Sequence, residues 1–193
     1  SLNPALIDIW MQKGNSLSSL GKKQESILAY SKALEINANL AEGWLKKADA
    51  LCDLGKMQDA ILAYTRALDI NPALYEIWMH KGDALNQLGK SEEAVLSYKK
   101  SLRINPEQES GWIKCGKAYF DLGRYQDAID AFDNAIGVNQ RSVEAFYYKG
   151  LSLEKINRAE GAIHVFEVLL EIDPKNGDAH YHKGLALAKL GDH

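Results

Sequence analysis

The sequence is poor in cysteine and proline and has no long apolar run. It has two cysteines among 193 residues, Cys52 and Cys115. A disulfide framework is therefore excluded, and a reducing, cytoplasmic compartment is expected. No apolar run approaches the roughly 18 residues of a membrane span, and no signal-peptide pattern is present, so no membrane partner is expected. The net charge is −3. The chain therefore lacks the excess of basic residues that is typical of nucleic-acid-binding proteins, and no nucleic-acid partner is expected.

What is abundant is apolar material. Hydrophobic residues make up 46% of the chain and charged residues 25%. This is an ordinary globular composition, because it supplies enough apolar surface to offset the entropy of the ordered chain. Disorder is therefore excluded as the dominant state.

The scarce residues recur with a period of 34. The tryptophans are Trp10, Trp44, Trp78 and Trp112, each 34 residues from the next. The four prolines fall on one lattice of the same period: Pro4, Pro72, Pro106 and Pro174. Two further registers hold glycine in most periods: Gly14, Gly82, Gly116, Gly150 and Gly184, with Ala48 in the gap, and Gly21, Gly55, Gly89, Gly123 and Gly191, with Asn157 in the gap. The chain is therefore built from internal repeats.

Each period predicts two helices joined by a tight turn. Apolar residues are spaced i, i+3 and i+4 on both sides of a glycine such as Gly55, where a helix would end in a left-handed conformation. Asparagine is the best substitute for that conformation, which fits Asn157. Asn71-Pro72 and its equivalents would then end the second helix.

We expect this hairpin to close through small residues. Ala48, or glycine at its register, would face an alanine of the second helix, Ala60 in the same period. The rows of tryptophan and of tyrosine or phenylalanine would fill the space between neighbouring hairpins as core packing.

This pattern resembles the tetratricopeptide repeat, whose signature is Trp-x2-Leu-Gly-x2-Tyr, then Ala-x3-Phe, then Pro. The third unit reads Trp78-x2-Lys81-Gly82-x2-Leu85, Ala94-x3-Tyr98 and Pro106. One departure recurs: lysine usually precedes the glycine, and we expect its stem to lie on the hairpin while its ammonium stays in water.

The resemblance implies an all-α, right-handed α-solenoid of stacked helix–turn–helix hairpins, forming a single domain over residues 1–193. The expected units are residues 7–40, 41–74, 75–108, 109–142 and 143–176, with a half repeat at 177–193. Leu2-Asn3-Pro4 matches the end of a unit, and the last helix carries Leu185, Leu187 and Leu190. We therefore expect the chain to be part of a longer array.

Catalytic chemistry is not expected. The sequence has no phosphate loop, nucleophile elbow or dinucleotide fingerprint. His180 and His182 lie two residues apart, so on a helix they point to different sides and make a poor metal pair. We predict no catalytic residues, no metal site and no cofactor.

The resemblance implies that first helices line a concave groove, where a peptide segment or helix of another protein binds. Along that groove the residues change from polar and acidic to aromatic and apolar. The candidate groove residues are Asn15, Lys46, Asp49, Asp83, Lys114, Lys117, Phe120, Tyr147, Tyr148, Leu151 and Tyr181. Rigid aromatic side chains provide contact area at low entropic cost. The alternative is that the tyrosines only pack between the last helices.

A second candidate surface is a row of leucines on the second helices, Leu28, Leu62 and Leu96. Each directly follows a core isoleucine or valine and should point away from the main packing side. The row is either an exposed convex interface or partly covered by neighbouring helices.

The expected function is that of a non-enzymatic scaffold or adaptor that binds another protein in the groove. Two alternatives stay open: a self-associating structural module, and a regulatory domain of a larger multidomain protein.

Overall fold

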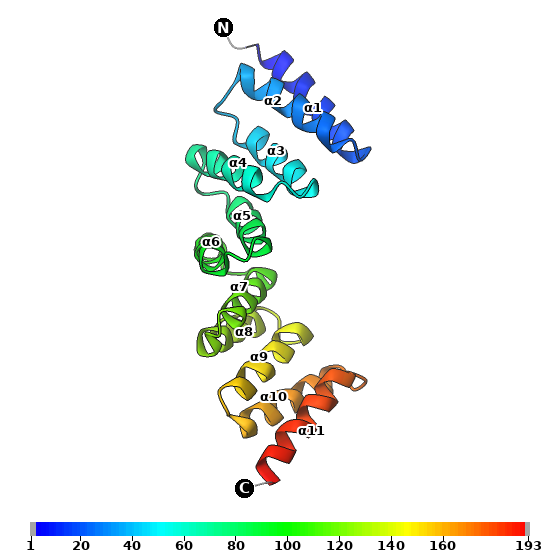
Figure 1. The fold of residues 1–193 in the computed structure, drawn as a ribbon, viewed down its shortest axis with the longest axis vertical. Coiled ribbons are helices and arrows are strands. Elements are labelled where there is room, and N and C mark those ends of the chain that lie inside the picture. The colour runs from blue at the N-terminus through cyan, green and yellow to red at the C-terminus, as the bar shows by residue number, and fades with distance from the viewer. Residues whose placement is uncertain (1–2, 192–193) are drawn as a thin grey trace. The chain divides into compact units, whose positions relative to one another are not determined.

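The computed structural model describes residues 3–191, which form eleven α-helices and no β-strand (Figure 1). The helices are α1 Pro4–Ser19, α2 Lys23–Ile36, α3 Ala41–Asp53, α4 Met57–Ile70, α5 Tyr75–Gln87, α6 Ser91–Ile104, α7 Glu109–Asp121, α8 Tyr125–Val138, α9 Val143–Lys155, α10 Ala159–Ile172 and α11 Gly177–Gly191. The expected all-α architecture of helical hairpins is confirmed. Leu2 and His193, on which the expectation of a longer array partly rests, lie outside the described residues.

The helices divide between two compact units. The first unit, Ser1–Ile104, contains α1 to α6, and the second, Asn105–His193, contains α7 to α11. Odd-numbered helices are the first helices of hairpins and pack against the even-numbered helix that follows, while α11 packs on α10. Successive hairpins also contact each other within each unit. The single domain over residues 1–193 and the bounds of its repeats stay predictions.

The turn inside each hairpin uses a left-handed residue, as the sequence indicates. Gly55 has a φ of 73°, three other turn glycines have φ between 72° and 75°, and Asn157 has a φ of 58°. The amide of Lys56 then donates to the carbonyl of Leu51 at 2.9 Å, which closes the end of α3. Because residues other than glycine and asparagine rarely adopt this φ, these two residue types fix the place where each hairpin turns.

The loop between hairpins is held by two side chains. Asn71 ends α4, and its side-chain oxygen accepts the amide of Ala73 at 3.1 Å. The indole nitrogen of Trp78 then donates to the carbonyl of Pro72 at 3.0 Å. Trp44 and Trp112 make the same bond to the carbonyl six residues earlier, both at 2.8 Å. The half-buried tryptophans therefore tie each loop to the helix that follows it.

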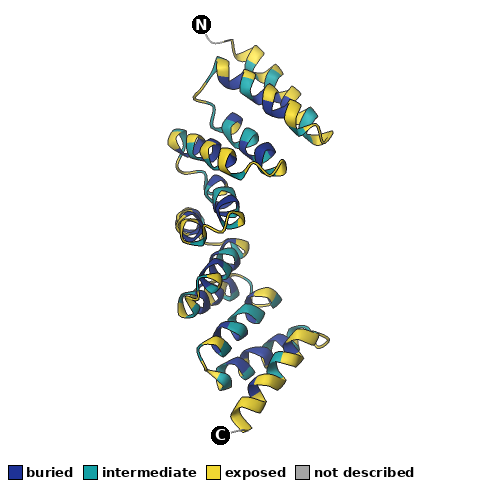
Figure 2. Cartoon of the chain, viewed as in Figure 1, coloured by how far each residue is buried: buried dark blue, intermediate teal, exposed yellow. Residues whose placement is uncertain are grey.

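The core of each hairpin differs from the expected contact between small residues. A Cβ added at Gly116 would lie 2.5 Å from the ring of Phe132, so the ring occupies the space beside the glycine. Tyr30, Tyr98 and Phe166 cover Gly14, Gly82 and Gly150 in the same way. A ring, rather than the expected alanine, is therefore the nearest neighbour of each of these glycines. The rings also reach the next hairpin, as expected, since Phe132 stacks on Tyr148 and Phe166 on His182. The glycine makes room for an aromatic ring of its own hairpin, and these rings are buried. Buried and exposed residues alternate along the helices of the hairpins (Figure 2).

The lysines that precede the glycines lie against tryptophan rings on the same helix. The ammonium groups of Lys13 and Lys47 are 4.9 and 5.3 Å from the ring centres of Trp10 and Trp44. Such cation–π contacts suit a lysine whose stem covers apolar surface. The departure from the family signature is therefore compatible with the fold.

Candidate functional site

The first helices of the first unit present one polar side chain from each hairpin, held by a buried tyrosine. In each case the tyrosine hydroxyl donates to a side-chain oxygen 15 residues earlier. The three bonds join Tyr30 to Asn15 at 2.9 Å, Tyr64 to Asp49 at 2.7 Å and Tyr98 to Asp83 at 2.9 Å. The three rings are each 2% exposed, so the core fixes the hydroxyls that orient this polar row of Asn15, Asp49 and Asp83.

Asp49 also contacts the first helix of the next hairpin. Besides the Tyr64 hydroxyl, its Oδ1 lies 2.9 Å from Nδ1 of His80 on the next first helix. Sγ of Cys52 lies 3.6 Å from the same hydroxyl. Burial, followed by the Asp49 charge, raises the pKa of Tyr64 far above its ordinary value. Burial likewise raises the pKa of the Cys52 thiol, which therefore lacks the low pKa of a reactive cysteine.

The second unit has different residues at the tyrosine register and at the position 15 residues before it. Phe132 and Phe166 stand at the tyrosine register, and the residues 15 positions earlier are Lys117 and Leu151. Tyrosine therefore accompanies asparagine or aspartate in three hairpins, and phenylalanine accompanies lysine or leucine in two. This link is not among the sequence predictions, although its signal is visible in the chain: the hydroxyl is present where a polar acceptor stands 15 residues before it.

The candidate aromatic residues of the second unit form one cluster, defined here as Phe120, Tyr147, Tyr148, Tyr181 and His182. Neighbouring ring centres lie 5.3 to 6.0 Å apart, mostly edge to face. Tyr148 stacks on Phe132 and His182 stacks on Phe166, both at 5.8 Å. Tyr181 is 63% exposed, while the other four are half-buried. The cluster is therefore anchored in the core and exposed at Tyr181.

Lys117 lies against the aromatic cluster. Its ammonium is 4.7 Å from the ring centre of Tyr148 and 3.0 Å from Oε1 of Glu144. Burial alone would lower the pKa of Lys117, but the hydrogen bond to Glu144 and the charge of Glu144 outweigh it and raise the pKa. This lysine therefore stays charged and is paired within the chain.

His182 links the last two first helices. Its Nδ1 lies 2.9 Å from Oε2 of Glu154 on α9, and both side chains are less than one quarter exposed. Together with the stack on Phe166, this contact fixes the inner edge of the aromatic cluster. His80 and Asp49 make the same kind of link in the first unit, so a histidine–carboxylate pair joins two neighbouring first helices in each unit.

The structure places every candidate groove residue on a first helix. Asn15, Lys46, Asp49 and Asp83 lie in the first unit, and Lys114, Lys117, Phe120, Tyr147, Tyr148, Leu151 and Tyr181 lie in the second. Of these residues, the structure brings Lys117 into contact with the aromatic cluster. Lys46 and Lys114 are half-buried on α3 and α7. A binding role for these residues stays a prediction.

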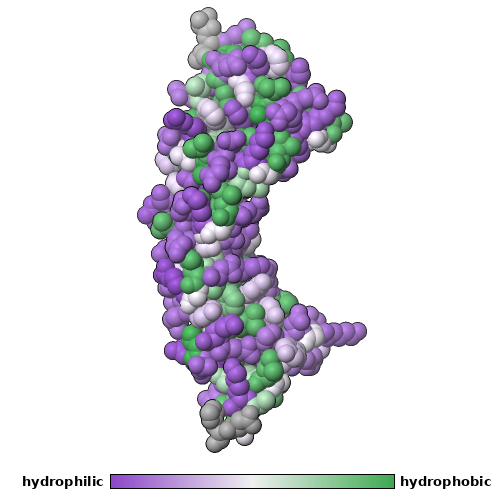
Figure 3. Space-filling model, in the orientation of Figure 1, coloured by the Kyte–Doolittle hydropathy of each residue, from purple (hydrophilic) through white to green (hydrophobic). Residues whose placement is uncertain are grey.

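The leucines of the second candidate surface are exposed. The exposed fractions are 60% for Leu28, 66% for Leu62 and 63% for Leu96, so most of the surface of each residue is accessible. On the face that Figure 3 presents, apolar surface is divided into separate patches among hydrophilic side chains. The interface role of the row stays a prediction.

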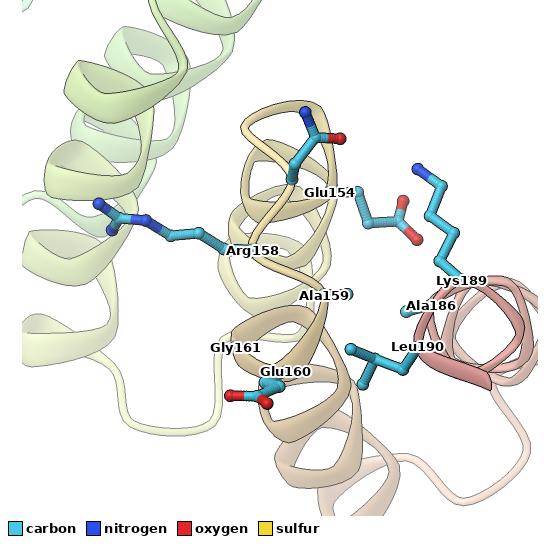
Figure 4. A pocket seen from close by; sticks show the side chains of 9 residues that line it. Glu154, Arg158, Ala159, Glu160, Gly161, Ala186, Lys189 and Leu190 are labelled. Atoms are coloured by element: carbon cyan, nitrogen blue, oxygen red, sulfur yellow. The ribbon is translucent and has the colours of Figure 1, made fainter. Parts of the chain in front are cut away.

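A pocket of about 730 Å³ lies between α11 and the turn that precedes α10. Glu154 and Lys189 extend toward its opening, whereas Arg158 points away from it (Figure 4). Ala186 and Leu190 form an apolar wall. Since Glu154 already bonds His182, the pocket offers few polar groups to hold a small ligand.

Within residues 3–191, no group of three or more His, Cys, Asp or Glu side chains is arranged to hold a metal ion. No buried side-chain polar atom in this range lacks a hydrogen-bond partner. None of the described helices combines the length and apolar character needed to cross a membrane. Nothing in the described part of the chain therefore marks a site for a tightly held cofactor.

Solved structures share this architecture. A MamA crystal structure matches with a TM-score of 0.84 and 24% identity, over 88% of this chain and 93% of that one. YrrB, described as a TPR protein with an unusual peptide-binding site, matches with a TM-score of 0.80 and 18% identity, over 91% and 90%. A tetratricopeptide repeat protein from Parabacteroides merdae matches with a TM-score of 0.82 and 20% identity, over 97% and 74%. At these identities the likeness shows the fold alone.

Family models cover most of the sequence. Models described as tetratricopeptide repeat match residues 7–40, 41–74 and 115–177, and one described as TPR repeat matches residues 82–123. No curated protein matches the chain. The period of 34, the hairpins with their left-handed turns and these matches agree, and the chain belongs to the tetratricopeptide repeat family.

Proposed function

We propose that this chain is a non-catalytic scaffold or adaptor that binds a peptide segment or a helix of another protein on its first helices. The observation that carries the proposal is the aromatic cluster, which ends in a tyrosine that is 63% exposed. A monomer gains little by exposing a large, rigid ring, whereas such rings supply most of the binding energy at many protein interfaces. The fold is that of an interaction scaffold, and the peptide-binding site described for YrrB supports a peptide ligand.

The proposed ligand has two kinds of side chain. The polar row supplies Asp49 and Asp83, whose carboxylates suit a lysine or arginine of the ligand, and the aromatic cluster suits an apolar or aromatic anchor. Since Lys117 is paired with Glu144, we expect it to shape the cluster rather than to bind a ligand carboxylate. The cations would steer association, and the anchor would slow dissociation.

We also propose a cytoplasmic setting and a protein partner rather than a nucleic acid or a membrane. Cys115 is buried and Cys52 half-buried, and both are free thiols. A net charge of −3 gives no general attraction to phosphate backbones or to anionic lipid.

Selection from a display library of random peptides against the full chain would test the function. We expect enriched peptides to combine basic residues with an aromatic or large apolar residue. Amide chemical shifts recorded during titration with an enriched peptide should change on α1, α3, α5, α7, α9 and α11. Failure to enrich any sequence, or shifts confined to second helices, would contradict the proposal.

A further inference from the structure

The second helices of the first unit carry an exposed stripe that the peptide-binding proposal does not use. Leu28 on α2, Leu62 on α4 and Leu96 on α6 occupy one register of three successive hairpins and are each at least 60% exposed. We call them the leucine row. Single exposed leucines are common, but a row repeated over three neighbouring hairpins is typical of a contact surface.

Charged residues flank the leucine row in a fixed order. Three residues before each leucine stands an acid, and four residues after it stands a base. The acidic row is Glu25, Asp59 and Glu93, and the basic row is Lys32, Arg66 and Lys100, all exposed. Positions i−3, i and i+4 share one strip of a helix. Each second helix therefore presents acid, leucine and base in line along its axis.

The fold does not require this stripe. Acids near the start and bases near the end of a helix are favoured by the helix dipole, which explains the charges in part. However, α8 carries Asp127, Asp130 and Asn134 at the three positions, and α10 carries Gly161, His164 and Val168. These two helices form the same hairpins without the stripe, so leucine and base are not needed for hairpin packing.

The charges of the stripe are available to a partner. Lys32 contacts Glu35 at 2.8 Å and Arg66 contacts Asp69 at 4.0 Å, both within one exposed helix turn. Exposed pairs of this kind contribute little to stability, so they exchange readily for pairs across an interface. Lys100 differs, because its ammonium lies 4.2 Å from the ring centre of Trp78.

Two hollows beside the row match each other residue by residue. One, of about 440 Å³, is lined by nine residues of α1 and α2, and the other, of about 580 Å³, by the nine residues 34 positions later on α3 and α4. In the second hollow, Asp59, Leu62, Ala63 and Arg66 stand at i, i+3, i+4 and i+7. Four residues at this spacing form the hole that accepts a leucine knob from a facing helix.

We propose that this stripe binds a second copy of the same chain, with a twofold axis parallel to the leucine row. Rotation about that axis places leucine over leucine and the acidic row of each copy over the basic row of the other. It also makes the facing second helices antiparallel, with Leu62 of each copy entering the hollow of its partner. A twofold axis across the row would place acid over acid and base over base, so the charge order selects the first arrangement.

Sedimentation of the full chain at concentrations from about 1 µM to about 1 mM tests the association, a range that suits interfaces below standard size. We expect a reversible monomer–dimer equilibrium that Leu62→Glu abolishes. The matched control is Leu20→Glu, because Leu20 is 72% exposed at the end of α1 and lies outside the row. Helicity and melting temperature should stay unchanged in both variants. A wild-type chain that stays monomeric throughout, or a Leu62→Glu chain that still dimerises, would overturn the proposal.

Reversing the charges at residues 59 and 66 tests the direction of the proposed twofold axis. Asp59→Lys alone and Arg66→Glu alone should each weaken dimerisation by about tenfold or more, because each places like charges face to face. An equimolar mixture of the two variants should dimerise again, since Lys at 59 then faces Glu at 66. Residues 59 and 66 are seven apart on α4 and do not pair within one chain.

Asp130→Lys, an exposed change on α8 outside the stripe, is the control and should leave the dimer unaffected. Variants that weaken the dimer singly and fail to restore it when mixed would refute the proposed axis. None of these substitutions changes a candidate groove residue, so peptide binding should persist in every variant, and failure of one proposal can be distinguished from failure of the other.

Discussion

The Tyr64 hydroxyl and Nδ1 of His80 meet at one atom, Oδ1 of Asp49, at 2.7 and 2.9 Å. The tyrosine belongs to the second helix of the same hairpin, and the histidine to the first helix of the next. One carboxylate therefore connects the core of a hairpin with its neighbour and contributes to the surface on which we propose that ligands bind.

Removing the hydroxyl should cost stability only where its acceptor remains. Tyr64→Phe should lower the free energy of unfolding by about 1 kcal/mol, because Asp49 loses a donor in a partly buried place. Adding Asp49→Leu recreates the pairing of Phe166 with Leu151, and the double variant should lose less than the sum of the single changes. Urea melts of the four chains give the coupling, and strictly additive losses would show that the hydrogen bond contributes nothing.

Alkaline pH should destabilise the fold through the buried tyrosines. Burial and then Asp49 raise the pKa of Tyr64 above its ordinary value, and burial also raises that of Tyr30. A tyrosine with a higher pKa in the folded chain contributes stability that is fully present below the unfolded pKa of about 10. That stability decreases above about pH 10 and is lost as the pH rises through the folded value.

Unfolding should therefore become easier above about pH 10, and less steeply so in Tyr64→Phe. Absorbance of phenolate during a pH titration, recorded with far-ultraviolet circular dichroism, checks both statements. If all tyrosines ionise near pH 10 while the helices persist, the rings are not protected as the structure implies.

The aromatic contact at the glycine register gives a matched pair of substitutions. Gly116→Ala places a methyl group against the Phe132 ring and should cost about 1–2 kcal/mol, since the ring must shift. Ala48 shows that a hairpin can make such an adjustment. Gly184→Ala meets no atom within 4 Å and should stabilise α11 by about 0.5–1 kcal/mol. Thermal melts with opposite shifts would agree with the structure, whereas equal shifts would not.

Binding and stability should separate within the aromatic cluster. Tyr181 is 63% exposed, so Tyr181→Ala should change the free energy of unfolding by less than about 0.5 kcal/mol while weakening a selected peptide. Tyr148 stacks on Phe132, so Tyr148→Ala should weaken binding by about 1–3 kcal/mol and also lower stability. Calorimetric titration beside urea melts distinguishes the two effects. A Tyr181→Ala chain that binds as the wild type does would move the anchor elsewhere.

The hairpins could be predicted from the sequence because their boundaries depend on local chemistry. Gly55 and Asn157 mark turns through a backbone conformation that few residues adopt, and Asn71-Pro72 marks a helix end. The ring that covers each glycine could not be predicted in the same way. Gly116 indicates only that space is needed, and which side chain occupies that space depends on how two helices are rotated against each other.

The candidate site was predictable in composition rather than in contacts. The change from acidic to aromatic residues is visible in the chain, but the partners of Asp49 and Lys117 come from neighbouring hairpins, 31 and 27 residues away. Rotamers and the offset between hairpins decide such pairs. The division between tyrosine with an acceptor and phenylalanine without one was readable, since both residues lie in the same hairpin.

Because the indoles of three tryptophans bond the loop before their helix, tryptophan fluorescence reports on some loops of the chain and not on others. Trp44, Trp78 and Trp112 report on three successive loops, whereas the same register holds Phe146 on α9 and His180 on α11. Tryptophan emission therefore reports on Trp10 of α1 and on loosening of the loops before α3, α5 and α7, whereas no tryptophan lies on α9 to α11. A difference between emission and circular dichroism during unfolding would reveal from which end the array begins to open.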